Sequence, residues 1–156
     1  MVAGGVGSFQ PRHLGVEHAA AFEGTQIHYS VKNAADFHGR RLVIFGGGDS
    51  ALDWTLDLAP KAASIALVHR RPDFRGAPAS AAKVRELVAG GRLRFIEGLA
   101  HGLHHEAGQL RGVHVKAAGG VRALHRLADA ARNARRRSGP AGRRAVAGAR
   151  HALTAQ

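Results

Sequence analysis

The sequence predicts an α/β domain with a parallel sheet, followed by a basic tail rich in alanine, arginine and glycine. Three observations carry this prediction. Short apolar runs of strand length alternate with segments of helical periodicity, as they do in parallel α/β folds. A turn of three glycines joins the first of these strands directly to a helix. The composition changes near Lys116, which separates a segment able to form a core from one that need not.

The first predicted strand and helix lie on either side of the glycine turn. Arg41–Phe45 is a short apolar run that fits a buried parallel strand and stops at the glycines. In the helix expected over Ser50–Ala59, small and apolar side chains recur at helical spacing, and Pro60 ends the pattern. A strand that leads straight into a helix is the first half of a βαβ unit.

Four further elements follow in the same alternation, bounded by glycine, proline or polar residues. They are a strand over Ser64–Val68, a helix over Ser80–Ala89, a strand over Leu93–Ile96 and a strand over Leu110–Val115 that is entered through a turn at 106–109. Strands that alternate with helices predict a parallel sheet with helices layered on it.

The glycine turn matches a dinucleotide-binding fingerprint. The residues in order are Gly46, Gly47, Gly48, Asp49, Ser50 and Ala51, which fit G-x-G-x-x-A. In that pattern the first glycine allows a tight turn, the second lets the backbone approach a pyrophosphate, and the alanine lets helix and strand pack closely. The positive end of the helix then faces the phosphates. We expect a Rossmann-like three-layer NAD(P)-binding domain in which these residues hold the pyrophosphate, although glycine loops of this kind also occur without a ligand.

A basic loop follows the second strand, about 20 residues past the glycines, where a dinucleotide fold reads the ribose. His69, Arg70, Arg71 and Arg75 belong to this loop, and no acid ends the strand to accept the ribose hydroxyl of NAD. Guanidinium groups grip a dianionic phosphate through charge-assisted, bidentate hydrogen bonds. The loop therefore favours the 2′-phosphate of NADP(H), and the alternative is a solvated basic turn.

Together these motifs resemble those of the thioredoxin-reductase-like ferredoxin–NADP reductases, a branch of the flavoprotein pyridine nucleotide–disulfide oxidoreductases. The matching segments are Gly5–Arg12, Ile27–Lys32, Leu42–Trp54 and Leu67–Arg75. The resemblance implies an oxidoreductase in which hydride moves between NADPH and FAD and electrons pass to or from ferredoxin or a similar small carrier. It also implies that Phe9 approaches FAD and that the intact enzyme is a homodimer.

The absence of cysteine separates two branches of this superfamily. Thioredoxin reductases carry a C-x-x-C dithiol just after a tyrosine, and here Tyr29 is followed by Ser30 and Asn33 at the thiol positions. Thiol–disulfide exchange needs a thiolate. The resemblance therefore points to the ferredoxin branch, with another thioredoxin-reductase-like flavoprotein as an alternative. No catalytic side chain is expected within the chain itself.

The charge of the chain is concentrated at its end. Residues 117–156 hold nine arginines and one acid, which gives them +8 of the net charge of +12. We expect residues 1–24 to be a crossover remnant of the FAD-binding half, residues 25–116 to be the NADP(H)-binding domain, and residues 117–156 to be a disordered or loosely helical tail. Because the flavin fingerprint of the family is missing, an incomplete enzyme is expected. A further hypothesis is that the tail comes from translation of the gene in a shifted reading frame.

The tail also supports a rival function, a nucleic-acid-binding protein in which a helix over Val121–Arg137 presents arginines to phosphates. Non-specific binding alone is expected of any arginine-rich tail.

The chain has neither a long apolar stretch nor a secretory leader, so a cytoplasmic protein without membrane contact is expected. No metal site is expected, and a cluster of histidines at the last predicted strand is interpreted as surface residues: His101, His104, His105 and His114.

Overall fold

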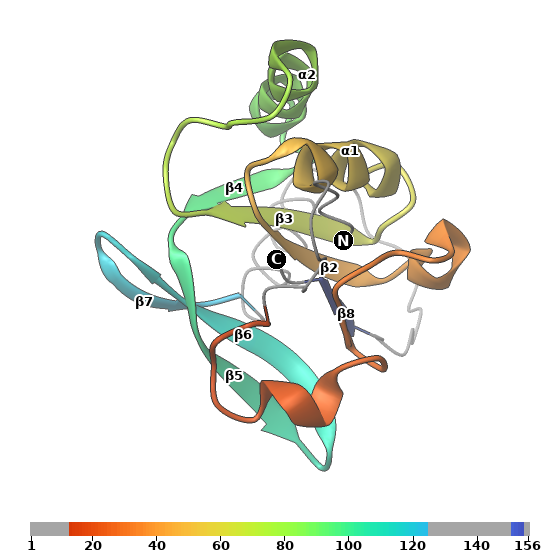
Figure 1. The fold of residues 1–156 in the computed structure, drawn as a ribbon, viewed down its shortest axis with the longest axis vertical. Coiled ribbons are helices and arrows are strands. Elements are labelled where there is room, and N and C mark those ends of the chain that lie inside the picture. The colour runs from red at the N-terminus through yellow and green to blue at the C-terminus, as the bar shows by residue number, and fades with distance from the viewer. Residues whose placement is uncertain (1–12, 125–150, 155–156) are drawn as a thin grey trace, which may run out of the picture.

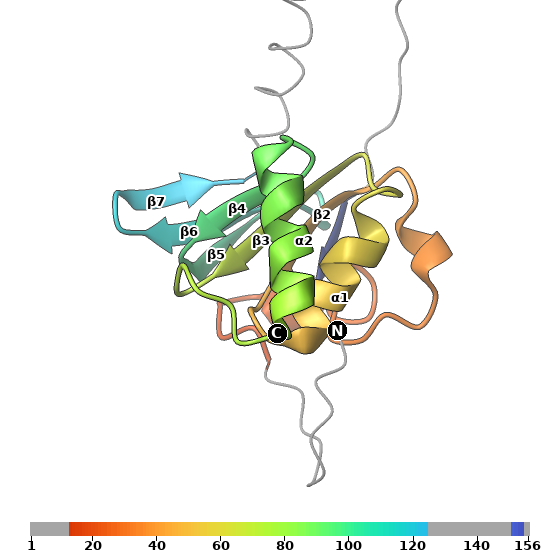
Figure 2. The same ribbon diagram turned by 90° about the horizontal axis from the view of Figure 1, so that it is seen from above.

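A five-stranded parallel sheet forms the middle layer of the computed structural model, which describes residues 13–124 and 151–154 (Figures 1 and 2). Its strands run in the order β1-β8-β2-β3-β4. They are β1 (Ile27–His28), β2 (Arg41–Phe45), β3 (Ser64–His69), β4 (Arg94–Glu97) and β8 (His151–Thr154). Each neighbouring pair is parallel, so all five strands end at the same edge of the sheet.

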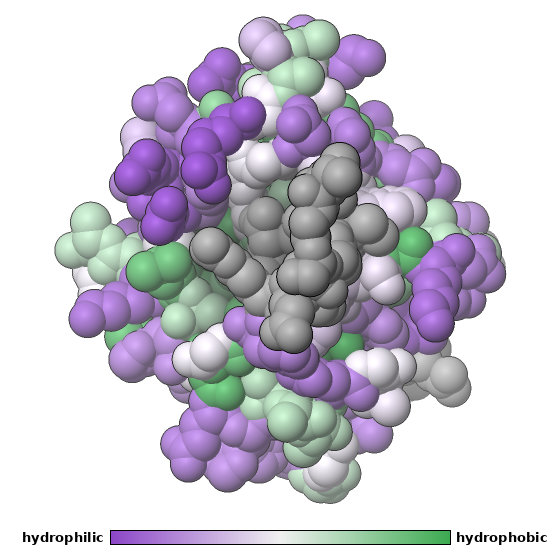
Figure 3. Space-filling model, viewed as in Figure 1, coloured by the Kyte–Doolittle hydropathy of each residue, from purple (hydrophilic) through white to green (hydrophobic). Residues whose placement is uncertain are grey.

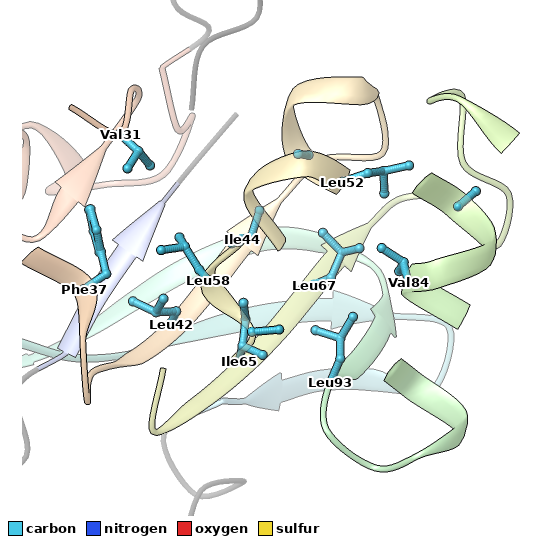
Figure 4. Packing of buried hydrophobic residues seen from close by; sticks show 13 residues of the cluster. Val31, Phe37, Leu42, Ile44, Leu52, Leu58, Ile65, Leu67, Val84 and Leu93 are labelled. Carbon is cyan, nitrogen blue, oxygen red and sulfur yellow. The ribbon is translucent and has the colours of Figure 1, made fainter. Parts of the chain in front are cut away.

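Two α-helices, α1 (Asp49–Leu58) and α2 (Pro78–Ala89), cover one face of this sheet. Figure 4 shows Ile44 directed toward α1 and Leu67 directed toward Val84 of α2. Two short 3-10 helices, η1 (Ala19–Phe22) and η2 (Ala34–Phe37), precede β2. Within the described ranges, no helix is long and apolar enough to cross a membrane.

A three-stranded antiparallel sheet covers the opposite face (Figure 1). Its strands are β5 (Leu99–Glu106), β6 (Gln109–Ala117) and β7 (Gly120–Ala123). Val68 and Phe45 of the parallel sheet share a core with Val113 and Val115 of β6. Neighbouring residues of β3 therefore serve two cores, because Leu67 packs toward the helices and Val68 toward the antiparallel sheet.

The predicted α/β class, the parallel sheet and its two helices are confirmed. The bounds of β2 are the predicted ones, and α1, β3, α2, β4 and β6 lie within a few residues of their predicted positions. The expectation that helices cover the sheet holds for one face only, since a β-sheet forms the third layer. The turn at 106–109 is a tight hairpin, in which Ala107 and Gly108 take φ of 48° and 70°.

The expected boundary at Lys116 is wrong, because β6 continues through Ala117 and β7 lies wholly beyond it. Leu124 is 7% exposed and belongs to the core, and β8 is a central strand of the parallel sheet. The expectation of a disordered or loosely helical tail thus fails for residues 117–124 and 151–154. Residues 125–150 lie outside the described residues, as does most of the helix expected over Val121–Arg137, whose first three residues are in β7.

Two substitutions beyond Lys116 test whether this segment stabilises the fold. Leu124→Ala removes a buried side chain and should lower the free energy of unfolding by about 2–5 kcal/mol. Val121→Ala alters a side chain that is 52% exposed, so it should change that free energy by no more than about 0.5 kcal/mol. Urea unfolding of the full chain measures both. Equal, small effects would mean that residues after Lys116 do not pack on the core.

Candidate functional site

The candidate site lies at the carboxyl edge of the parallel sheet, where β2 leads into the glycine turn and β3 into the basic loop (Figure 1). The two strands are in register, with Phe45 opposite Val68. The two loops therefore leave the sheet side by side, and α1 begins directly after the glycine turn. Ligands of open parallel sheets bind at this edge.

The glycine turn has the shape that its pattern predicts. Gly46 takes φ of +145°, which strongly favours glycine, and its N–H donates to the Val68 carbonyl oxygen at 2.9 Å. Gly48 precedes α1 in an extended conformation, and a Cβ built on it would meet no atom of the described residues within 4 Å. Ala51 is fully buried against the sheet, whereas Ser50 is half-buried in the first turn of the helix. Among the described residues, the space beside Gly48 at the start of α1 is therefore open.

Gly47 lies against the side chain of His69. A Cβ built on Gly47 would be 2.5–2.6 Å from three atoms of the imidazole ring, a distance that real Cβ atoms do not adopt. The ring of His69 thus occupies the volume that any larger side chain at position 47 would need. The sequence pattern assigned no special packing role to this middle glycine.

Hydrogen bonds tie the basic loop to the glycine turn. The backbone N–H groups of Arg75 and Gly76 donate to the Gly47 carbonyl oxygen at 2.7 and 3.2 Å. The Ala77 N–H donates to Oδ1 of Asp49 at 2.6 Å. Asp49, predicted as a cofactor-binding residue, therefore uses its carboxylate to hold the loop. The two motifs that the sequence analysis singled out form one structural unit.

Phe74 anchors the other side of the basic loop. Its ring meets that of Phe95 in β4 edge to face, with centroids 5.2 Å apart. The guanidinium carbon of Arg85 in α2 lies 5.8 Å from the Phe74 ring centroid, and Arg85 also approaches Asp73 at 3.8 Å. The sequence alone did not predict these contacts, because they join the basic loop, β4 and α2, whose relative positions only the fold determines.

The side chains of Arg70, Arg71 and Arg75 are exposed, and none forms an ion pair with any residue that the structure describes. Figure 3 shows hydrophilic side chains gathered over the loop between β3 and α2. Three guanidiniums on one short loop, whose single carboxylate (Asp73) pairs with Arg85 instead, form a site suited to an anion.

His69 differs from the arginines that follow it because its side chain is buried, with the residue 8% exposed. Nε2 is also buried and has no hydrogen-bond partner among the described residues. Burial is the main cause that lowers the pKa of His69, and the charges of Arg70, Arg75 and Arg71 lower it further. The imidazole is therefore neutral at neutral pH.

The remaining predicted residues lie apart from this edge or outside the described range. Phe9 is among the residues that the structure does not describe. Asn33, at a position where thioredoxin reductases carry a thiol, caps η2, since its Oδ1 accepts from the Ala35 N–H at 3.0 Å. The rings of His104 and His114 stack with centroids 6.5 Å apart. No group of three side chains within residues 13–124 is arranged to hold a metal ion.

A βαβ unit with a glycine turn and a basic loop at one sheet edge has the arrangement typical of α/β domains that bind dinucleotides. The chain is 53% identical over 120 residues to ferredoxin–NADP reductase 2 of Cupriavidus metallidurans. It is 52% identical over 124 residues to the ferredoxin–NADP reductase of Methylibium petroleiphilum. These matches confirm the predicted resemblance to ferredoxin–NADP reductases.

Each match covers 77% of this chain but only 33% and 34% of the relative, so the chain spans about a third of the length of the curated relatives it matches. No protein-family model matches the chain.

Solved structures show the same fold. Thioredoxin reductase of Streptococcus pyogenes superposes with a TM-score of 0.64 at 23% identity, over 73% of this chain and 38% of that one. Bacillithiol disulfide reductase of Staphylococcus aureus superposes with a TM-score of 0.62 at 21% identity, over 72% and 33%. At these identities the likeness concerns the fold alone.

The lowered pKa of His69 predicts weaker folding in acid. The unfolded chain takes up a proton near the ordinary value of 6.5, whereas the folded chain takes it up only at lower pH. This contribution to stability is complete above that value and is lost as the pH falls below it. Urea unfolding from about pH 8 to about pH 5 should show wild type losing stability relative to His69→Phe. Parallel profiles would contradict the burial of a neutral imidazole.

Proposed function

We propose that this chain binds NADP(H) and is the nucleotide-binding part of an FAD-dependent oxidoreductase of the ferredoxin–NADP reductase type. One observation carries the proposal. Three exposed guanidiniums without ion-pair partners among the described residues follow β3, and hydrogen bonds hold their loop against the glycine turn. Identity of about half the residues to named ferredoxin–NADP reductases supports the same function.

In this proposal the pyrophosphate lies beside Gly48. The space that the described residues leave open there, and the backbone N–H groups at the start of α1, suit a diphosphate that must approach the chain closely. Ser50 lies in the first helical turn and presents its N–H toward the same end. Gly46 and Ala51 act indirectly, by shaping the turn and by letting α1 pack on β2.

The 2′-phosphate of NADP(H) meets the guanidiniums of Arg70, Arg71 and Arg75. Each guanidinium is permanently charged and donates hydrogen bonds in a planar fork that matches phosphate oxygens. NAD(H) has no phosphate at this position and gains nothing from the loop. The site should therefore select NADP(H) over NAD(H).

FAD is the second cofactor of the intact enzyme in this proposal, with Phe9 near the flavin. Hydride passes between the nicotinamide and the flavin, and single electrons pass between the flavin and ferredoxin or a similar carrier. The residues of this chain bind and orient the nucleotide. The homodimeric state of the intact enzyme, which the resemblance implies, and the cytoplasmic location expected from the sequence belong to the same proposal.

Nucleotide titrations of the full chain test the binding site. Arg70→Ala or Arg71→Ala should weaken NADPH about ten- to a hundredfold, because a hydrogen bond to a charged group contributes roughly 1.5–3 kcal/mol. The affinity for NADH should change little. Gly48→Val is the contrasting variant, since a Cβ at this position meets no described atom within 4 Å and the valine side chain would enter the proposed pyrophosphate space. It should weaken both nucleotides alike, and arginine variants that do the same would exclude a 2′-phosphate site.

A chimera tests the reductase part of the proposal. The matched third of ferredoxin–NADP reductase 2 of Cupriavidus metallidurans is replaced by the corresponding residues of this chain. The chimera should retain NADPH-dependent reduction of ferredoxin, and the same chimera with Arg70→Ala and Arg71→Ala should require far more NADPH. A flavin-containing chimera that is inactive at any NADPH concentration would count against the proposal.

A further inference from the structure

We propose that His69 is a positioning residue of the nucleotide site. Its imidazole fills the space beside Gly47 and sets the distance between the glycine turn and the basic loop. The inference rests on the proposed function, since that spacing matters through the affinity for NADP(H). It assigns His69 a role in shaping the site and none in contacting the nucleotide.

The contact between Gly47 and His69 is the first support. Three ring atoms lie within 2.5–2.6 Å of the place where a Cβ on Gly47 would stand. The ring cannot easily move away, because His69 is 8% exposed and ends β3, where its carbonyl oxygen accepts from the Gly98 N–H at 2.8 Å. The ring of Phe74 lies on another side, with its centroid 6.2 Å from that of His69.

The second support is the carbonyl group of Gly47, because it links the contact between Gly47 and His69 to the loop that carries the arginines. It accepts the N–H groups of Arg75 and Gly76 at 2.7 and 3.2 Å. Gly47 is also the residue directly before Gly48, beside which the pyrophosphate is proposed to lie. A shift of Gly47 away from the imidazole would therefore displace both halves of the nucleotide site at once.

The burial of the ring is the third support, because it separates His69 from a ligand. Nε2 is buried without a hydrogen-bond partner in the described part of the chain. The next residue, Arg70, is exposed at the site. Because Nε2 makes no hydrogen bond within the described residues, the ring acts mainly through its shape, so an apolar ring of similar size should replace it.

Titrations of the full 156-residue chain with NADPH and NADH test this inference on four variants. Gly47→Ala should weaken both nucleotides roughly ten- to a hundredfold, because small displacements of binding groups are costly. His69→Ala should weaken both as well. In the double variant the new Cβ enters the space that the ring leaves, so adding Gly47→Ala to His69→Ala should change the affinity by no more than about threefold. His69→Phe should bind both nucleotides within about threefold of wild type.

The outcomes separate the two proposals. If wild type binds both nucleotides and Gly47→Ala is equally harmful with and without His69, the positioning role is wrong. The positioning role is also wrong if His69→Phe loses affinity as His69→Ala does, because His69 would then be a ligand. A wild-type chain that binds neither nucleotide overturns the proposed function and this inference with it. If Gly47→Ala does not fold, recovery of a cooperative thermal transition in the double variant supports the contact, and its absence overturns it.

Discussion

The carbonyl oxygen of Gly47 joins the two halves of the candidate site. Two backbone N–H groups of the basic loop donate hydrogen bonds to this one oxygen, while the imidazole of His69 packs against the same residue. The geometry follows from the sheet, because the register between Phe45 and Val68 brings both loops to one edge. The hydrogen bonds in addition fix the distance between the basic loop and the glycine turn. Without them, exposed arginines on a surface loop would sample many positions relative to the start of α1, and ordering them would oppose binding.

The middle sheet supplies the rigidity on which this edge depends. Its strands are short, but the sheet is covered on both faces, as the division of β3 between two cores shows. The helices and the antiparallel sheet therefore hold the strand ends from opposite sides. The loops at the carboxyl edge can then present polar and charged groups without themselves forming the core, which is the usual division between scaffold and site in α/β proteins.

The sequence predicted those parts of the fold that local pattern determines. The apolar run at Arg41–Phe45 and the helical spacing after it are signals contained in a short segment, and the site motifs lie directly at their ends. The strands that were missed are held by pairing with other segments. β7 pairs through its backbone with β6, and β8 lies between β1 and β2, so both form in a segment whose content of alanine, arginine and glycine suggested a disordered tail. The contact of Gly47 with His69 escaped prediction for a related reason, because only the register of two strands brings them together.

The acid of the basic loop explains how the arginines stay available. Asp73 is the only carboxylate between His69 and Arg75, and a loop with three like charges would gain most by pairing it with one of them. Instead its nearest cationic partner is Arg85 of α2, at 3.8 Å, and Arg85 also covers the ring of Phe74. This exposed pair contributes little to stability by itself. Its consequence is electrostatic, since the carboxylate is drawn toward the helix and the loop retains a net positive charge at the sheet edge. If the proposed 2′-phosphate binds at this loop, its charge would relieve the mutual repulsion of the three guanidiniums.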